Sequence, residues 1–335
     1  MAVRYIDGFE DYATAQLLLG NWNAIGAGVT IAAGAGRSGA ALYCPQKTAT
    51  KTLDAQSTWI VGFAVKFTSL AAGWFACLLD GATEQVTLCV AANNTLYIAR
   101  GATSVGASIQ TVSPNTWYYI EFKVTVADSI GAGTAVVRVN GETWITVATG
   151  SDLKATTNAY ADALRLGNAT AGYQYFDDLY ILDGVAGPVA GDNDFLGDVR
   201  VDSLLPTGAG STTAWTPDSS SNYARVNEAA PDETSYVSSV TVDQIDTYAM
   251  ANLATTPAKI WAVQTGLVVR KMDAGSRSIA PVLRGADGDK VGTTRSVGDS
   301  YYNYQQVYEQ NPLTTPADWT ESSLNAIEMG IKLIA

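Results

Sequence analysis

Two alternating runs joined by Asn140-Gly141 constrain the fold of this chain more than any other stretch. Residues 134–147 read TAVVRVNGETWITV, so an Asn-Gly pair separates two runs in which apolar and polar side chains alternate. Asn-Gly is the strongest short-range signal of a β-hairpin, because a type I′ turn needs positive φ at both central residues. Residues 117–126 alternate in the same way, with one slip near Ile120, as expected of a half-buried strand. The centre of the chain is therefore predicted to be an antiparallel sheet.

Short strand-like runs separated by turns continue over the first 185 residues of the chain. Further strand-like runs occur at 57–69, 73–79, 86–90, 96–99, 163–167 and 175–183. Short strands with turns about every 8 to 12 residues are typical of β-sandwiches and jelly rolls. Charged residues make up 16% of the chain, against about 25% in an average globular domain, which suits a protein with many short turns. We therefore predict an all-β protein.

A length of 335 residues allows two domains. Residues 184–194, GVAGPVAGDND, are small and flexible and contain proline, as expected of a boundary. Strand-like runs resume beyond this stretch, at 236–242, 246–250, 259–270, 278–284, 300–307 and 327–333. Thr320 is a candidate cap for a short helical turn before the last run. We predict an antiparallel jelly-roll sandwich over 1–185, a linker over 186–194 and a second β-sandwich domain over 195–335.

The charge of the chain argues against two classes of partner. The net charge is −12 and the pI is about 4.4, and no basic cluster exceeds Arg270-Lys271. A nucleic-acid binder needs a basic footprint, and an anionic membrane surface attracts one, so neither partner is expected. No apolar run approaches the roughly 18 residues of a membrane span, and the amino terminus has no secretion signal. An acidic surface instead suits solubility, cation binding or a basic partner protein.

The chain contains no histidine. This absence removes Ser-His-Asp and Cys-His catalysis, histidine-containing zinc or iron sites and the imidazole general base. The three cysteines are few for the length. Cys77 and Cys89 flank a turn at Asp80-Gly81 and could face each other across a hairpin, while the alternative is that all three are buried free thiols of a cytoplasmic protein.

Four segments of the first half resemble the laminin-G/concanavalin A-like jelly roll. They are DGFEDY at 7–12, WYY at 117–119, VVRVNG at 136–141 and FDDLYIL at 176–182. In that superfamily a tryptophan opens one strand, a short hairpin follows, and the last strand is rich in aspartate. The resemblance covers residues 1–185 and implies an antiparallel jelly roll there.

The whole chain also resembles virion proteins of tailed bacteriophages that carry such a domain. The resemblance includes GDVRVDSLLPTG at 197–208, the segment with Trp215 and Asn222-Tyr223, and DWTESSLNAIEMGIK at 318–332. It implies synthesis in the cytoplasm of a host bacterium, assembly with other virion proteins, and a homo-oligomer. We expect a structural protein on the exterior of the virion, associated with the tail or a fibre, that can bind host surface glycan. The alternatives are a capsid decoration or head-fibre protein and a polysaccharide depolymerase.

The carboxylates of this sequence do not match a known catalytic pattern of the concanavalin-like fold. Glucanases of the concanavalin-like fold carry E-x-D-x-E on one strand, and this sequence has no such triplet. Adjacent side chains on a strand point to opposite faces, so Asp177 and Asp178 are predicted not to act as a pair. From these absences we predict that the chain is not an enzyme.

No cofactor is required by this interpretation, and calcium is the candidate metal. Asp7 and Asp178 would bring the first and last strands of the domain to one oxygen-ligand site. Local alternatives are 192–194 (Asp-Asn-Asp) and 287–289 (Asp-Gly-Asp), and none of these has the spacing of an EF-hand loop. Isolated acidic pairs in an acidic protein are usually solvated turns.

Exposed aromatic side chains are the candidates for contact with a glycan or a partner protein. We select Tyr173, Tyr175, Tyr301, Tyr302 and Tyr304. Further candidates are three tryptophans, Trp22, Trp59 and Trp74, while Trp117 and Trp144 are interpreted as core and strand residues. Aromatic side chains of β-sandwiches are more often buried in packing than exposed, so packing is the alternative for each of these residues.

Overall fold

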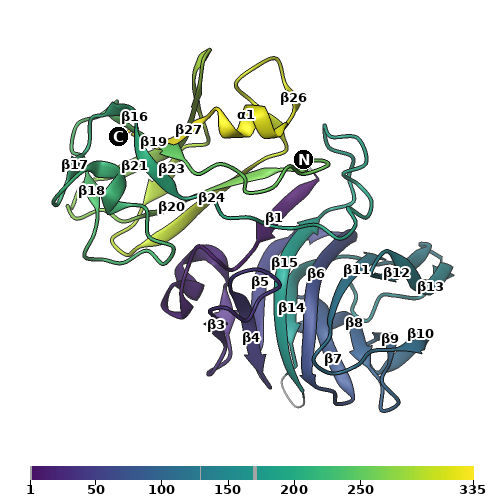
Figure 1. Ribbon diagram of the computed structural model, residues 1–335. Coiled ribbons are helices and arrows are strands. Elements are labelled where there is room, and N and C mark those ends of the chain that lie inside the picture. The colour runs from purple at the N-terminus through teal and green to yellow at the C-terminus, as the bar shows by residue number, and fades with distance from the viewer. Residues whose placement is uncertain (1, 129, 169–171) are drawn as a thin grey trace. The chain divides into compact units, whose positions relative to one another are not determined.

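The computed structural model describes residues 2–128, 130–168 and 172–335, which form two compact units. The first unit comprises the chain up to Glu10 together with Asn21–Val201, and the second comprises Asp11–Gly20 together with Asp202–Ala335. The predicted linker, residues 186–194, therefore lies within the first unit. Strands dominate both units (Figure 1) and pair antiparallel, so the predicted all-β fold with antiparallel sandwiches is confirmed.

The described part of the first unit contains two antiparallel sheets. In spatial order, the first sheet consists of β13 (Glu142–Ser151), β12 (Gly133–Val139), β11 (Trp117–Thr125), β6 (Thr58–Ser69), β15 (Tyr173–Leu182), β4 (Ala41–Pro45) and β3 (Thr30–Ala32), with β1 (Val3–Asp7) also paired to β15. The second sheet consists of β10 (Thr103–Thr111), β9 (Thr95–Arg100), β8 (Thr83–Val90), β7 (Gly73–Asp80), β14 (Ala161–Gly167), β5 (Thr48–Gln56) and β2 (Ala24–Ile25).

The two sheets pack through aromatic side chains that alternate along β6. Phe63 and Phe67 both meet Phe75 of β7 edge to face, with ring centroids 6.4 and 5.0 Å apart. Phe63 also meets Phe176 of β15 at 5.6 Å. Because successive side chains of a strand point to opposite faces, Ala64 and Lys66 of β6 lie on the other side of the first sheet. We call that side the outer face.

The central hairpin forms as predicted, since β12 and β13 pair and φ is +50° at Asn140 and +83° at Gly141. The predicted slip near Ile120 is absent, because β11 pairs with β6 without a break from Trp117 to Thr125. Ile120 lies opposite Phe63, on the inner face, and Tyr119 therefore points to the outer face. The apparent slip arises because Tyr119 is a buried aromatic residue on the side of the sheet that the pattern assigns to polar residues.

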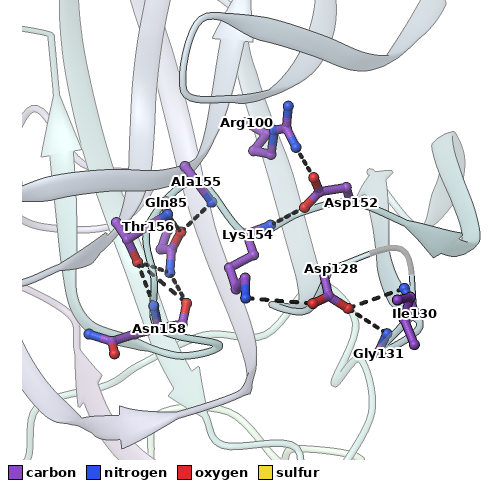
Figure 2. Close-up of polar contacts among 10 residues, drawn as sticks. All are labelled: Gln85, Arg100, Asp128, Ile130, Gly131, Asp152, Lys154, Ala155, Thr156 and Asn158. Carbon is purple, nitrogen blue, oxygen red and sulfur yellow. Dashed lines mark hydrogen bonds and ion pairs between the residues drawn. The ribbon is translucent and has the colours of Figure 1, made fainter.

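The loop that follows β13 is held by a buried glutamine of β8 (Figure 2). The Gln85 side chain is fully buried, and its oxygen accepts from the backbone N–H groups of Ala155 and Thr156 at 2.6 and 3.0 Å. Its nitrogen donates to the Thr156 hydroxyl and to the Asn158 carbonyl at 2.9 and 2.8 Å. Every polar atom of this side chain is therefore used to fix the loop, which gives Gln85 a structural role.

The second unit contains one larger sheet and three two-stranded ribbons in its described residues. In spatial order, the larger sheet consists of β16 (Pro206–Thr213), β19 (Ile245–Met250), β27 (Glu328–Leu333), β21 (Arg277–Gly285) and β22 (Gly288–Val291), with β23 (Arg295–Val297) also paired to β21. The ribbons are β20 (Val263–Val269) with β24 (Tyr302–Tyr308), β17 (Thr216–Pro217) with β18 (Val237–Ser238), and β25 (Gln310–Asn311) with β26 (Ala317–Asp318). Leu267, Val269 and Tyr304 of the first ribbon pack against Ile279, Ile331 and Leu333 of the larger sheet.

Helical structure is sparse among the described residues. The helical turns are α1 (Glu321–Asn325), η1 (Thr14–Gln16), η2 (Leu17–Asn21) and η3 (Asn222–Arg225). The predicted cap is confirmed, because the Thr320 hydroxyl accepts from the Ser323 backbone N–H at 3.1 Å. In the part of the chain that the structure describes, none of these helices has the length and apolar character needed to cross a membrane.

All three cysteines are buried free thiols. Cys77 of β7 lies opposite Thr87 of β8, and Cys89 lies opposite Trp74, so the two cysteines do not face each other across the hairpin. Of the two alternatives that the sequence left open, the structure therefore has the free thiols.

Candidate functional site

A line of three aromatic side chains and one lysine crosses four adjacent strands of the first sheet on its outer face. Trp117 of β11 lies opposite Lys66 of β6, Lys66 lies opposite Tyr175 of β15, and Tyr175 lies opposite Tyr43 of β4. Directly opposed residues of antiparallel strands project to the same face. With strands about 4.8 Å apart, the line is about 14 Å long. We call these four residues the aromatic row.

The members of the aromatic row contact one another along its length. The Lys66 Nζ atom lies 4.8 Å from the ring centroid of Trp117 and 4.8 Å from that of Tyr175. The Tyr175 and Tyr43 rings stack at 4.7 Å with an interplanar angle of 24°. All four side chains are partly exposed. Tyr173, two residues before Tyr175 on the same strand, is 36% exposed. Burial raises the pKa of Tyr43, and the neighbouring Tyr175 and Tyr173 raise it further.

The cation in the row has no carboxylate partner among the residues that the structure describes. Lys66 donates to the backbone carbonyl of Ala35 at 3.3 Å, and it forms no ion pair with any residue that the structure describes. Two rings and one carbonyl oxygen therefore hold this ammonium. The row as a whole offers apolar ring surface, phenol hydroxyls and one positive charge on rigid strands.

A cluster of buried carboxyl groups lies next to the aromatic row on the same face. Asp177 follows Tyr175 by two positions and lies opposite Ala64 of β6. Its Oδ2 accepts from the Arg37 backbone N–H at 2.6 Å, and Arg37 Nη1 donates to Asp178 Oδ2 at 3.2 Å. Both aspartates therefore lie on one side of the sheet, and the prediction that they point to opposite faces is wrong. The register of β15 shifts between Asp177 and Tyr180, and Asp178 has a φ of +50°, so a bulge turns the second side chain to the outer face.

Burial and mutual repulsion keep protons on this cluster. Burial, together with repulsion from the nearby Asp177, Asp178 and Asp7, raises the pKa of Glu10 to about 9. Burial and the neighbouring Asp178 carboxylate together raise the pKa of Asp177 to about 7. Burial raises the pKa of Asp178, although Arg200 and Arg37 oppose this. A carboxylic acid is therefore present in this part of the sheet at neutral pH.

The two predicted calcium ligands, Asp7 and Asp178, both lie near enough to Glu10 to raise its pKa, but their oxygens are used for other contacts. Asp7 accepts from the Tyr5 hydroxyl at 2.7 Å and from the Phe9 backbone N–H at 2.9 Å. Asp178 accepts from Arg200 Nη1 at 2.9 Å and from the Val201 N–H at 3.0 Å, in addition to Arg37. Among the described residues, no group of three histidine, cysteine or acidic side chains is placed to hold a metal ion. These carboxylates do not fit a calcium ion as they stand, and calcium binding stays a prediction.

In the two local alternatives for a calcium site, aspartate side chains form contacts that stabilise the fold. Asp192 accepts from the backbone N–H groups of Gly187 and Val189 at 2.9 and 3.1 Å, which closes a turn. Asp289 forms an ion pair with Arg284 of the neighbouring strand.

The predicted tyrosines of the second unit make contacts within that unit. Tyr304 packs on the apolar cluster of its own unit. Tyr302 is 45% exposed, and its ring centroid lies 5.0 Å from that of Tyr304. The Arg270 Cζ atom lies 4.8 Å from the ring centroid of Tyr301. Of the tryptophan candidates, Trp22 and Trp59 are core residues with 1% and 0% exposure. Trp74 is partly buried against the second sheet.

Sequence reasoning named Tyr175 of the row and Tyr173 beside it, but missed the other three members of the row. Trp117 was interpreted as a core residue, yet it lies on the outer face beside Lys66. Tyr43 and Lys66 carried no local signal, because their place in the row depends on strand pairings between distant parts of the chain. Glu10 was missed as well, and the only signal for it was the acidic composition of 7–11.

No family model and no curated protein matches the chain. Several solved structures resemble part of it. The alginate lyase Aly36B is 13% identical, with a TM-score of 0.34 over 52% of this chain and 95% of its own. Domain 4 of the GH43 extracellular arabinanase AbnA from Geobacillus stearothermophilus, in complex with arabinotriose, is 15% identical, with a TM-score of 0.34 over 47% and 76%. A Trypanosoma rangeli sialidase is 11% identical, with a TM-score of 0.34 over 43% of this chain and 25% of its own.

These similarities correct one prediction. The structures named are enzymes or a domain of one, so the expectation that this chain is not an enzyme is withdrawn. The absence of histidine and of an E-x-D-x-E triplet does not carry that exclusion, because carboxyl groups with raised pKa values occur on the outer face. At these identities and TM-scores, the similarity assigns no substrate or reaction to this chain.

Proposed function

We propose that the first unit binds polysaccharide along the aromatic row. The observation that carries this proposal is the placement of Trp117, Tyr175 and Tyr43 in register across adjacent strands, with partly exposed side chains. Tyrosine and tryptophan side chains combine a large apolar surface with a polar group. The apolar surface can pack against the C–H groups of a sugar ring, and the polar group can form a hydrogen bond with its hydroxyl groups. Side chains fixed on strands lose little conformational freedom on binding. A length of about 14 Å accommodates a short run of sugar rings.

The test is binding of a polysaccharide panel by wild type and by single variants. Trp117→Ala and Tyr175→Ala are expected to weaken binding about tenfold each, because truncation of an aromatic side chain on which binding depends costs more than about 1 kcal/mol. Tyr302→Ala is the matched control, since it removes an exposed tyrosine from the other unit. Affinity electrophoresis measures the binding, and circular dichroism confirms the fold of each variant. Equal binding by all three variants would contradict the proposal that the aromatic row binds polysaccharide.

We further propose that the chain works as a component of a tailed-bacteriophage virion, where polysaccharide binding is attachment to the host surface. The sequence segments at 197–208 and 318–332 support this proposal through their resemblance to such proteins. The partners are then other virion proteins and further copies of this chain, and the chain is made in the host cytoplasm. Antibody labelling of particles tests it. Label at the tail or its fibres is expected, label over the head favours a decoration protein, and unlabelled particles contradict the proposal.

The second candidate function is polysaccharide cleavage next to the row, which the protonated carboxyl groups favour. A general acid needs a pKa near the working pH, and burial raises the pKa of Asp177 to about 7. Asp177 is fully buried beneath the Gly36–Arg37 backbone, so cleavage requires that segment to move. Release of short sugar chains by wild type but not by Asp177→Asn would establish the activity. Intact polymer after incubation with wild type would exclude it for that substrate.

A further inference from the structure

Lys66 stands out among the cations of this acidic chain. The chain carries 32 acidic and 20 basic residues, so carboxylates are in excess, and two of the basic side chains on or beside the outer face have one. Arg37 pairs with Asp178 and Lys123 with Asp194. Lys66 lies on the same face and has no such partner among the described residues, although its Nζ is fixed by two rings and the Ala35 carbonyl.

The position of this ammonium is defined by the rings on either side of it. Equal distances of 4.8 Å to the Trp117 and Tyr175 centroids place the charge in line with the aromatic surface. Cation–π contacts hold a cation without neutralising its charge. An ammonium group has three donors, and one of them is directed to Ala35. The others remain for a ligand that lies along the row.

The neighbouring carboxylates do not compete strongly for Lys66. Asp178 is engaged by Arg37 and Arg200, and Asp177 by the Arg37 backbone. Both carboxyl groups are buried, while Lys66 is partly exposed. A raised pKa further reduces the negative charge of Asp177 at neutral pH. The charge facing solvent at the centre of the row is therefore positive.

We propose that the aromatic row selects anionic polysaccharides, and that Lys66 binds the acidic group of a sugar whose ring lies against Trp117 or Tyr175. This inference rests on the proposed polysaccharide-binding function and names its substrate class. An ammonium–carboxylate or ammonium–sulfate hydrogen bond is charge-assisted and stronger than the neutral contacts that a plain sugar offers. An alternative role for Lys66 is packing alone, in which its stem and charge only fill the space between two rings.

The experiment compares polymers that differ only in charge. Polygalacturonate is paired with its carboxyl-reduced form, and dextran sulfate with dextran, so the two pairs separate carboxylate from sulfate as the acidic group. Wild type is expected to bind at least one anionic polymer about tenfold or more tightly than its neutral counterpart. The preference is expected to shrink as salt rises from about 0.1 to 1 M, where the Debye length falls from about 10 to 3 Å.

Two variants assign the preference to the charge of Lys66. Lys66→Met keeps an apolar stem and is expected to bind both members of a pair equally, while Lys66→Arg keeps the charge and is expected to retain the preference. Equal binding of both polymers by wild type, or an unchanged preference in Lys66→Met, would overturn the inference. Failure of the proposed function has a different signature, namely no polymer bound at all, or binding that Trp117→Ala leaves unchanged.

Discussion

Glu10 is the residue at which the electrostatics of the outer face are most unusual. Its Oε2 atom is buried and has no hydrogen-bond partner among the described residues, and three aspartates act on it. A carboxylate in such a place is costly, so the group holds its proton, with a pKa raised to about 9. The sequence showed neither the burial nor the neighbours, because Asp177 and Asp178 lie far along the chain.

Because of Glu10, the stability of the protein is expected to fall as the pH rises. Its pKa is near 4.5 when unfolded and about 9 when folded, so the folded state binds the extra proton between these values. The contribution is complete below about pH 4.5 and is lost as the pH rises through 9. The melting temperature is therefore expected to fall between pH 5 and 8, and Glu10→Gln is expected to flatten this fall. Thermal melts across that range measure it, with the exposed Glu142→Gln as the control. An unchanged slope in Glu10→Gln would contradict this account of the cluster.

Gln85 gives a second prediction at the scale of one residue. Gln85→Ala removes the acceptor of the Ala155 and Thr156 N–H groups, and the loss of one such hydrogen bond costs about 0.5–1.5 kcal/mol. The free energy of unfolding is expected to fall by at least that amount in urea titrations. Gln110→Ala, on an exposed position of β10, is the control and is expected to change it by less than about 0.5 kcal/mol. Equal stability of the two variants would show that the loop does not depend on Gln85.

At the scale of the element, strand β6 determines the outer face because β11 and β15 pair with it on either side. The hairpin of β12 and β13 could be predicted from the sequence, since its turn and its alternation are local. The pairing of β6 with β15 joins residues about a hundred positions apart, and no local pattern specifies it. The aromatic row could not be predicted for this reason, although Tyr175 was recognised. The bulge at Asp178 could not be predicted either, because an aspartate in a strand-like run does not by itself indicate a positive φ.

Gly62 of β6 supplies a prediction for this pairing. It lies opposite Tyr180 of β15, and a Cβ atom at Gly62 would overlap the Tyr180 ring. That ring cannot move away easily, because its hydroxyl donates to the buried Glu121 carboxylate at 2.6 Å. Gly62→Ala is expected to destabilise the protein by about 1–3 kcal/mol, measured by chemical denaturation. Gly298→Ala is the control, because nothing lies within 4 Å of its added methyl group. A neutral Gly62→Ala would mean that β6 and β15 pair in another register.

At the scale of the whole molecule, each unit has its own sheets and its own apolar core. Composition and strand spacing were enough to predict an all-β chain with two such parts, because these properties are spread over many residues. The division after Val201, rather than near residue 190, was not predictable. Glycine and proline marked residues 184–194 as a boundary, but Leu196, Gly197 and Val201 donate to Tyr180, Glu121 and Asp178 of the first unit.

The central claim is that the outer face of the first sheet holds a polysaccharide on the aromatic row. A crystal structure of the whole chain with an acidic oligosaccharide, such as a short oligogalacturonate, tests it most directly. The account predicts sugar rings in contact with Trp117, Tyr175 or Tyr43, and an acidic oxygen about 3 Å from the Lys66 Nζ atom. An oligosaccharide bound elsewhere, for example at Tyr302 in the second unit, with the row in contact with solvent alone, would contradict it.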